Sequence, residues 1–435
     1  GIEDFTSSGV IENMEGESQT TASTLTLQTL AGQTSFFNGF IRDRANNTGS
    51  GTLNLIISGS GTQVLSGGNI SFSGSTTINS GATLVLERTT AYGNGVGGAA
   101  ATQLGDRSIT NNGTLQLQIE NGGTWTFNRA VTGTDGLTRF GNGTLNLSAA
   151  MSVGAGVRII DGFTSNAATN INSAMTVTNG GFYIRGIQNL STVNWNSAVN
   201  VQAGGLTIVG SGDNVTNGAI LNVTASSAVT GAVDVRAGDL RLSGANGKIT
   251  GVTSLRVGGS GSSAGGVAGD QQGLNLINTE SANSADSANN TDRIPDSAPI
   301  TLDAGRVALS GTGTGTQAFS ETLGVLSLAG GSNLAFAQKI NAGSTALTFQ
   351  GLGTRAQGAT MVFDTVVSGT ATGATIGFSS APANNPAGIL GGWAIVSTSR
   401  DVSGTQTQFR EWATISGGLV TPLSSYETGG EAAWG

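Results

Sequence analysis

The residues that could carry out chemistry in this chain are mainly its carboxylates, because histidine and cysteine are both absent. Without them the chain lacks the usual base near neutral pH, the commonest transition-metal ligand, and any thiolate or disulfide. Glycoside hydrolysis would need two carboxylates about 5–10 Å apart. The candidates are Asp135, Asp161, Asp234, Asp239, Asp303 and Asp364. They are scattered, and Asp135 and Asp161 each precede a glycine, as turn residues do, so we assign no catalytic residue.

Three short motifs resemble known sites, but the residues around each of them do not support that function. Gly261–Gly265 has the G-x-S-x-G spacing of a nucleophile elbow, but no histidine exists to serve as its base. Gly93-Asn94-Gly95 is expected by chance in a chain with 71 glycines and marks no dinucleotide site. Lys248 follows a glycine but precedes Ile249, so there is no Walker motif. We therefore predict no cofactor site and no metal site.

Residues 258–299 form a polar stretch rich in Ser, Ala and Asn. Its acids are Asp270, Glu280, Asp286, Asp292 and Asp296. Neither an EF-hand pattern nor a nonapeptide calcium repeat is present. Long loops on a rigid scaffold often carry function, but a flexible excursion is the simpler interpretation, and we favour it.

Aromatic residues gather near the C-terminus. They are Trp393, Trp412, Trp434 and Tyr426. Such rings could form a sugar-stacking platform, but they more often belong to a core or an interface. We favour the second interpretation.

Composition limits the partners of the chain. Its 435 residues carry a net charge of −8 with a pI of about 4.6, which disfavours nucleic acid and anionic membrane surfaces. No segment reaches the roughly 18 apolar residues of a membrane span, so we expect no membrane insertion. Residues 1–16 carry four acids and resemble no signal peptide. We expect this to be either a processed chain or a piece of a longer one.

The elements that must position any site come from a short repeat. A glycine and one or two small residues precede an alternating apolar triplet, as at Gly51, Gly81, Gly113 and Gly143. These four glycines recur at nearly even intervals along the chain. On a strand, the period of two sends both outer apolar side chains to one face, and glycine tolerates the positive φ of a tight corner.

Two folds could use this pattern. The many Asn-Gly dipeptides, such as Asn112-Gly113 and Asn179-Gly180, are typical of hairpins, so tandem β-sandwiches are one alternative. Short and evenly spread apolar runs, recurring Ser, Thr and Asn for stacked polar ladders, and no helical stripe favour a solenoid. We predict an all-β chain, a right-handed parallel β-helix forming a single elongated rod, with coils of about 20–24 residues.

The run from Gly61 to Leu86 resembles the autotransporter-associated β-strand repeat. Its parts are Gly61-Thr62-Gln63-Val64-Leu65-Ser66-Gly67, then Thr76-Thr77-Ile78-Asn79-Ser80-Gly81, then Thr83-Leu84-Val85-Leu86. The turn at residues 69–74 is slightly longer than the family pattern. The resemblance implies a bacterial surface or secreted passenger with a β-helical fold, and it implies no single biochemical activity.

The predicted organisation is a β-solenoid over 1–257, an excursion over 258–299 and a continued solenoid over 300–435. The expected function is a non-enzymatic structural or adhesive rod at a bacterial surface or outside the cell. Its expected partners are host or surface glycans and proteins, or further copies stacked end to end through Gly1-Ile2 and Trp434-Gly435. The alternative is a carbohydrate-active β-helix, such as a polysaccharide lyase or a tailspike-like depolymerase.

Overall fold

The computed structural model describes most of the chain, and all of its regular elements are strands. The described ranges are 9–13, 21–43, 51–66, 69–88, 108–119, 123–161, 168–186, 191–210, 219–258, 273–280, 290–313, 316–369, 371–402 and 405–423. No helix occurs within them, so none there could span a membrane, and the all-β prediction is confirmed. Two compact units divide the chain: residues 1–240 with 249–252, and residues 241–248 with 253–435.

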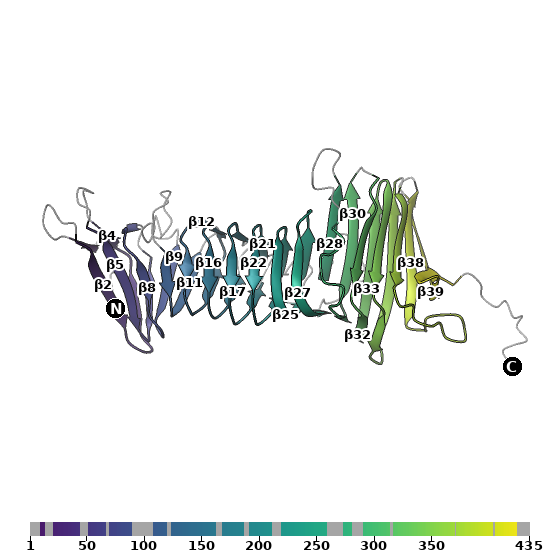
Figure 1. Ribbon diagram of the computed structural model, residues 1–435, viewed down its shortest axis with the longest axis horizontal. Coiled ribbons are helices and arrows are strands. Elements are labelled where there is room, and N and C mark those ends of the chain that lie inside the picture. The colour runs from purple at the N-terminus through teal and green to yellow at the C-terminus, as the bar shows by residue number, and fades with distance from the viewer. Residues whose placement is uncertain are drawn as a thin grey trace, which may run out of the picture. The chain divides into compact units, whose positions relative to one another are not determined.

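The strands of unit 1 fall into three sets, or faces, which successive coils extend (Figure 1). The third face consists of two separate sheets, and the coil with residues 76–88 has no described strand in it. The first face contains β2 (Ser23–Thr29), β5 (Leu53–Gly59), β8 (Thr76–Ile78), β10 (Ile109–Asn111), β13 (Val131–Thr132), β16 (Met151–Val153), β19 (Met175–Val177), β22 (Val199–Val201) and the start of β25 (Ser226–Arg236). The second face contains β3 (Thr34–Phe37), β6 (Thr62–Leu65), β9 (Thr83–Arg88), β11 (Thr114–Ile119), β14 (Leu137–Gly141), β17 (Val157–Asp161), β20 (Phe182–Arg185), β23 (Leu206–Val209) and the end of β25. The third face contains β1 (Val10–Glu12), β4 (Phe40–Arg42) and β7 (Asn69–Ser71), then β12 (Thr124–Phe127), β15 (Thr144–Leu147), β18 (Ala168–Ile171), β21 (Ser191–Trp195) and β24 (Ala219–Val223).

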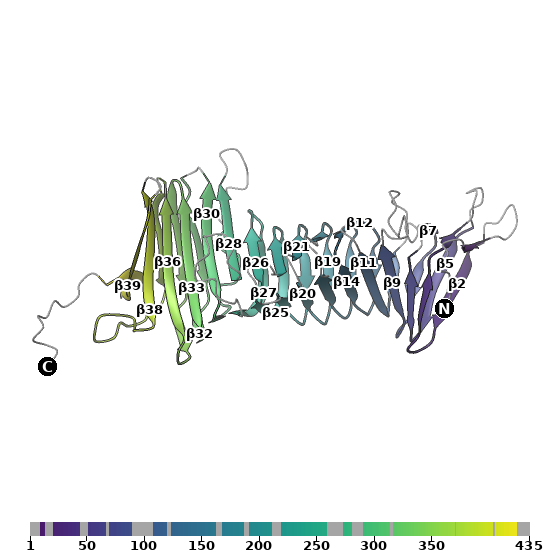
Figure 2. The same cartoon turned by 180° about the vertical axis from the view of Figure 1, so that it is seen from behind.

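Strands of successive coils pair side by side and in the same direction (Figure 2). On the second face Leu137 pairs with Val157, Val157 with Phe182, and Phe182 with Leu206. These steps agree roughly with the expected coil length. The step from Thr83 to Thr114 is clearly longer, so the expected range of coil lengths was too narrow. All described pairings within unit 1 are parallel, which agrees with the solenoid interpretation rather than with stacked sandwiches.

The apolar triplets point into unit 1, as their alternation predicts. Leu53 and Leu55, Leu84 and Leu86, Leu115 and Leu117, and Leu145 and Leu147 are all at most 4% exposed. Aromatic rings are buried there as well. Trp195 is fully buried against Phe182, with ring centroids 5.1 Å apart in an edge-to-face arrangement.

One inward position of unit 1 holds a charged residue. Arg139 occupies the column between Leu117 and Ile159 and is fully buried. Its guanidinium donates to the carbonyl of Gly141 at 2.6 Å and also to the carbonyl of Gly143. Burial lowers its pKa to about 9, because removal from water disfavours the charged form.

Outward asparagines form a ladder on the third face. Asn170 donates to Asn146 at 2.7 Å, Asn194 donates to Asn170 at 2.6 Å, and Asn222 donates to Asn194 at 2.8 Å. The two middle amides therefore both donate and accept, and each bond ties one coil to the next. The prediction of stacked polar ladders is confirmed on this face.

We expect Asn170→Ala to destabilise unit 1 by about 1–2 kcal/mol, because it removes two inter-coil hydrogen bonds at once. The matched control is Asn200→Ala, which removes an exposed asparagine of β22 on the first face and should cost less than about 0.5 kcal/mol. Urea unfolding followed by circular dichroism compares the two. Equal costs would contradict a stabilising role for the ladder.

Unit 2 continues with longer strands. β26 (Asp239–Ser243) and β27 (Lys248–Gly258) span the boundary. They are followed by β28 (Gly273–Glu280), β29 (Ile300–Asp303), β30 (Arg306–Gly313), β31 (Phe319–Leu323), β32 (Leu326–Gly330), β33 (Ser332–Ile340), β34 (Gly343–Phe349), β35 (Leu352–Arg355), β36 (Thr360–Ser368), β37 (Ala371–Phe378), β38 (Ala394–Val402), β39 (Thr405–Ser416) and β40 (Leu419–Pro422). Three parallel ladders run through it: β27–β29–β32–β35, β28–β30–β33–β36–β38 and β31–β34–β37.

The parallel order ends at β38. β39 pairs antiparallel with β38 over its first part and with β40 over its last part, and β40 contacts β37. The side of β38 that faces away from β36 is thus already paired. Covering a sheet edge in this way removes a template for further strands.

The expected excursion at 258–299 is wrong in part. Its central residues, Gly273–Glu280, form β28 and pair in register with β30. The alternation in Leu274 and Leu276, both fully buried, provides the physical reason. Residues 259–272 and 281–289 of that segment lie outside the described residues.

Candidate functional site

The six sequence candidates do not converge on one carboxylate site. In unit 1, Asp135 accepts the N–H of the following Gly136 at 2.7 Å, as a turn residue does. Asp234 pairs with Arg236, and Asp239 is only 4% exposed. In unit 2, Asp303 pairs with Arg256, while burial raises the pKa of Asp364 and a hydrogen bond from Ser397 opposes that rise. The side chain of Asp161 lies outside the described residues.

A groove of about 350 Å³ crosses the second face of unit 1. Its lining residues are Thr114, Asp135, Gly136, Leu137, Thr138, Ala155, Gly156, Arg158, Gly180, Gly181, Phe182, Tyr183, Gly204 and Thr207. These come from β11, β14, β17, β20 and β23 and from the corners that precede them, so the groove runs across the strands. At about 4.8 Å per strand, five strands give it a length of about 20 Å.

Glycine corners form one wall of this groove because the coils approach one another there. Gly180 and Gly181 have φ of 77° and 74°, and Gly204 and Gly205 have φ of 87° and 68°. A Cβ on Gly180 would lie 1.9 Å from the carbonyl oxygen of Ala155. The wall is therefore backbone, and only glycine permits it.

The other wall is made of outward side chains of β14, β17, β20 and β23, namely Thr138, Arg158, Tyr183 and Thr207. The same row continues beyond the groove to Asp234 of β25. Strand register places Thr138, Arg158, Tyr183, Thr207 and Asp234 side by side in that order. We call this set row 1.

A second row runs parallel to it, two residues further along each strand. It consists of Phe140, Ile160, Arg185, Val209 and Arg236. We call this set row 2. Its apolar members are half-buried, while Arg185 and Arg236 are exposed, so apolar and basic groups are interleaved along it.

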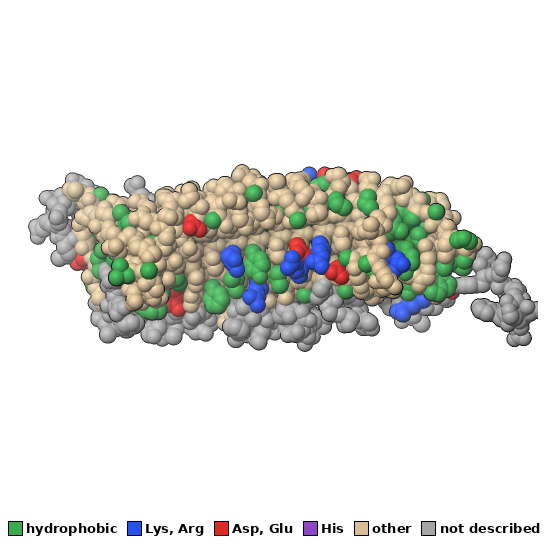
Figure 3. All heavy atoms as spheres, turned by 90° about the horizontal axis from the view of Figure 1, so that it is seen from below, with side chains coloured by type: hydrophobic (Ala, Val, Ile, Leu, Met, Phe, Trp, Pro, Cys, Tyr) green, Lys and Arg blue, Asp and Glu red, His purple; other side chains and the backbone are tan. Residues whose placement is uncertain are grey.

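Rows 1 and 2 concentrate basic charge on a thinly charged chain. Three exposed arginines, Arg158, Arg185 and Arg236, stand against one aspartate, Asp234. The whole chain has only 18 Lys and Arg residues and a net charge of −8. Figure 3 shows blue patches with green side chains and some red ones among them, on a face that is mostly uncharged. This surface attracts anions although the protein as a whole repels them.

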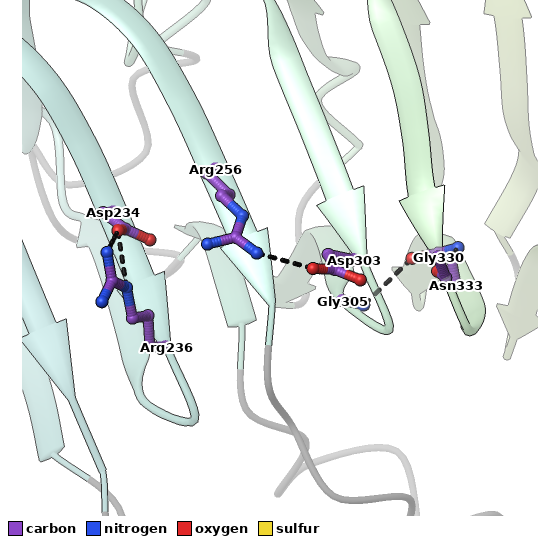
Figure 4. Close-up of polar contacts among 7 residues, drawn as sticks. All are labelled: Asp234, Arg236, Arg256, Asp303, Gly305, Gly330 and Asn333. Carbon is purple, nitrogen blue, oxygen red and sulfur yellow. Dashed lines mark hydrogen bonds and ion pairs between the residues drawn. The ribbon is translucent and has the colours of Figure 1, made fainter. Parts of the chain in front are cut away.

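Contacts within the rows orient these groups. The guanidinium of Arg158 lies 5.1 Å from the ring centroid of Tyr183, a cation–π contact. Arg236 donates through Nε to Asp234 at 2.6 Å, and both nitrogens that Figure 4 joins to this carboxylate belong to Arg236. The hydrogen bond and charge of Asp234 raise the pKa of Arg236, and Tyr183 contributes a small electrostatic part. Arg236 nonetheless leaves 57% of its side chain exposed.

Unit 2 carries a similar pair, on β27 and β29. Arg256 of β27 donates to Asp303 of β29 at 2.6 Å (Figure 4). Beside it Asn333 accepts the N–H of Gly305 at 3.0 Å and donates to the carbonyl of Gly330 at 2.9 Å. The asparagine closes a corner, so this pair belongs to a structural junction.

A buried ionisable cluster lies elsewhere in unit 2. Arg293 is fully buried and donates to the carbonyl oxygens of Gly247 and Ile277, at 2.7 and 3.0 Å. The backbone N–H groups of Arg293 and Ile294 donate to one oxygen of Glu321, at 2.9 and 3.3 Å. The other oxygen of Glu321 is buried with no hydrogen-bond partner among the described residues.

The titration of this cluster follows from its burial. Desolvation raises the pKa of Glu321 to about 8, although the two N–H groups and Arg293 oppose the rise. Burial lowers the pKa of Arg293 to about 10. Glu321 is therefore protonated at neutral pH, and its role is to hold the segment after residue 290 against β31.

The C-terminal aromatic residues do not form one platform in the described part of the chain. Trp393 is half-buried with Arg355 over its ring at 5.4 Å, while Trp412 of β39 is 41% exposed. Trp434 and Tyr426 lie outside the described residues, as do Gly261–Gly265 and Gly93–Gly95. No cluster of acids that could hold a metal ion occurs in the described ranges.

The sequence analysis did not find rows 1 and 2, because no local motif links their residues. Arg158 and Tyr183 belong to successive coils, and Arg185 and Arg236 belong to coils further apart. The available signal was indirect: each of these basic residues sits at an outward position of an alternating run. Only the coil register, which the sequence leaves open, aligns them.

Comparison with protein-family models, with curated proteins and with solved structures finds no match. The functional argument therefore depends on the residues of this chain.

Proposed function

We propose that the chain is a structural and adhesive rod at a bacterial surface or outside the cell, folded as a right-handed parallel β-helix of the autotransporter-passenger type. It acts without catalysis. The solenoid provides reach and stiffness, and its outward rows provide a repetitive surface for binding.

One observation carries this proposal: successive coils stack in register and align outward side chains into rows, as in the Asn146–Asn222 ladder and rows 1 and 2. A stack of this kind is stabilised by nearest-neighbour contacts between coils. Such a scaffold places one outward side chain of each row every ~4.8 Å, which suits multivalent attachment.

Self-association is a second part of the proposal. The expected junction residues, Gly1-Ile2 and Trp434-Gly435, lie outside the described residues. Among the described strands, β1, β2 and β3 of the first coil each pair on one side only, with β4, β5 and β6. β38 is instead covered by β39. Contact between first coils would close into pairs, whereas contact between unlike ends would build filaments.

The alternative is a carbohydrate-active β-helix, and the groove on the second face is the observation that favours it. Asp135 is the only acid among its lining residues, and that carboxylate is engaged by Gly136. An inverting or retaining hydrolase needs two carboxyl groups across the scissile bond. Adhesion is therefore the function that this geometry supports better.

Electron microscopy of the purified chain at rising concentration tests self-association, and attachment of labelled chain to bacterial and host cell surfaces tests adhesion. We expect rods that associate with one another as the concentration rises and attach to cells in a saturable way. Isolated rods that attach to no surface would contradict the proposal. Release of reducing or unsaturated sugars from a polysaccharide panel would favour the enzymatic alternative.

A further inference from the structure

We propose that rows 1 and 2, with the groove beside them, form a binding site for an acidic polysaccharide whose chain lies across the strands. This inference depends on the proposed function in that it names the ligand class of the adhesive surface. The recognised anion is a carboxylate or a sulfate ester on a sugar.

The charge and donor geometry favour an anion. Arg158 and Arg185 present planar guanidinium groups, which bind carboxylate and sulfate through two parallel N–H donors. Arg236, two of whose nitrogens contact Asp234, adds exposed positive charge beside them. Arg158 and Arg185 stand on neighbouring strands, and Arg236 stands two strands beyond Arg185 in the same row. Their spacing is thus about 5 to 10 Å along the stacking direction. An extended polyanion meets them one after another.

The groups between the arginines favour a sugar. Tyr183 offers an aromatic ring that Arg158 already orients, and rings of this kind bind the apolar faces of sugars while the hydroxyl bonds to their edges. In row 2 the half-buried Val209 lies between Arg185 and Arg236, and the half-buried Ile160 lies on the other side of Arg185. Thr138 and Thr207 add hydroxyls on the groove side.

The shape favours an extended chain over a folded protein partner. A groove about 20 Å long that crosses five strands fits a linear polymer. Protein interfaces need a desolvated apolar centre. The large hydrophobic side chains that are exposed among the described residues lie elsewhere: Val10, Leu30, Phe36, Val325, Trp412 and Leu419. A protein partner would find no such centre on rows 1 and 2.

The test measures binding of the purified chain to immobilised polygalacturonate, dextran sulfate, neutral dextran and single-stranded DNA at two salt concentrations. We expect binding to one or both acidic polysaccharides that weakens with salt, and none to neutral dextran. Carboxylate and sulfate as the recognised group are told apart by which of the two polymers binds. DNA bound as tightly as the acidic polysaccharides would overturn the proposal in favour of a general polyanion surface.

Variants identify the surface. Arg158→Gln, Arg185→Gln and Arg236→Gln should each weaken binding about tenfold, and the triple variant should abolish it. Tyr183→Ala should weaken binding with little change in its salt dependence. Arg42→Gln is the matched control, because it removes the same charge from β4, where Arg42 pairs with Glu12 at 2.7 Å. Equal effects of Arg42→Gln and Arg158→Gln would overturn the proposal, provided that circular dichroism shows each variant folded.

The outcomes separate this inference from the proposed function. A chain that attaches to cells but binds neither acidic polysaccharide would overturn the ligand and leave the adhesive function standing. A chain that binds the polysaccharide through these arginines but attaches to no cell surface would support the site and contradict the adhesive function.

Discussion

Unit 2 is expected to lose stability between about pH 4.5 and pH 8, and replacing Glu321 with glutamine is expected to abolish most of that decline. In the folded chain the pKa of Glu321 is raised to about 8 from an ordinary value of 4.5. Between these values the folded state holds a proton that the unfolded state has released, so the free energy of unfolding falls as the pH rises. The slope is about 1.4 kcal/mol per pH unit for one such proton.

Glutamine keeps the shape and one acceptor for the two N–H groups of Arg293 and Ile294, and it has no proton to lose. The variant should therefore match the wild type near pH 4 and exceed its melting temperature by several degrees near pH 8. Arg293 adds no slope here, because its lowered pKa of about 10 still lies above this range. Asp296 and Asp364 also have raised pKa values, so a residual slope in the same direction should remain.

Calorimetry of the full chain across this pH range measures the effect. Glu321→Ala provides the comparison at the same site: it removes the titration and also leaves the N–H groups of Arg293 and Ile294 without their acceptor. We expect Glu321→Ala to lose the pH dependence as Glu321→Gln does. Its free energy of unfolding should be about 1–3 kcal/mol lower than that of Glu321→Gln at every pH. A wild-type slope that persists in Glu321→Gln would show that another group titrates.

Alternation was the part of the fold that could be predicted most completely from the sequence. A strand has only two faces, so the burial of Leu115 and Leu117 follows from their spacing alone. The parallel pairing could be argued only indirectly, from short apolar runs, recurring Ser, Thr and Asn, and the lack of a helical stripe. Asn112-Gly113 and Asn179-Gly180 show why: each forms a corner between two faces of one coil, β10 to β11 and β19 to β20, although the same dipeptide also serves hairpins.

The spacing of the repeated glycines did not give the coil length, because a triplet that follows a glycine can lie on any of the three faces. The copies at Gly81 and Gly113 lead into β9 and β11 on the second face, but the copy at Gly51 leads into β5 on the first and that at Gly143 into β15 on the third. The nearly even spacing of these glycines therefore does not measure one coil throughout. Without the coil length, the alignment of Arg158 with Tyr183 could not be derived.

Buried charge was also beyond prediction from the sequence. Arg139 stands at an inward position of an alternating run, where the pattern predicts an apolar residue. Its place depends on the carbonyl oxygens of Gly141 and Gly143, which accept from its guanidinium at the corner that follows the strand. Glu321 and Arg293 are distant in the sequence and meet only through tertiary structure. Such pairs depend on three-dimensional contacts that local propensity does not encode.

Gly205→Ala is expected to cost unit 1 about 3 kcal/mol or more, because two penalties add at one atom. The backbone of Gly205 has a φ of +68°, which costs an L-residue about 1–2 kcal/mol. The new Cβ would also lie 2.2 Å from the carbonyl oxygen of Ala232 in the next coil. That oxygen cannot easily retreat, because Leu206 and Val233 beside it are paired in register.

Gly32→Ala separates the two penalties. Gly32 has nearly the same φ, +72°, but nothing lies within 4 Å of the Cβ it would acquire. This variant should show only the conformational cost of about 1–2 kcal/mol, and the difference between the two urea midpoints measures the packing of one coil on the next. Stability in a coil stack is a sum of neighbour contacts, so separating β23 from β25 also disturbs Thr207 and Asp234 of row 1. Gly205→Ala should thus weaken polysaccharide binding as well as stability, whereas equal costs for the two glycines would contradict close stacking at this corner.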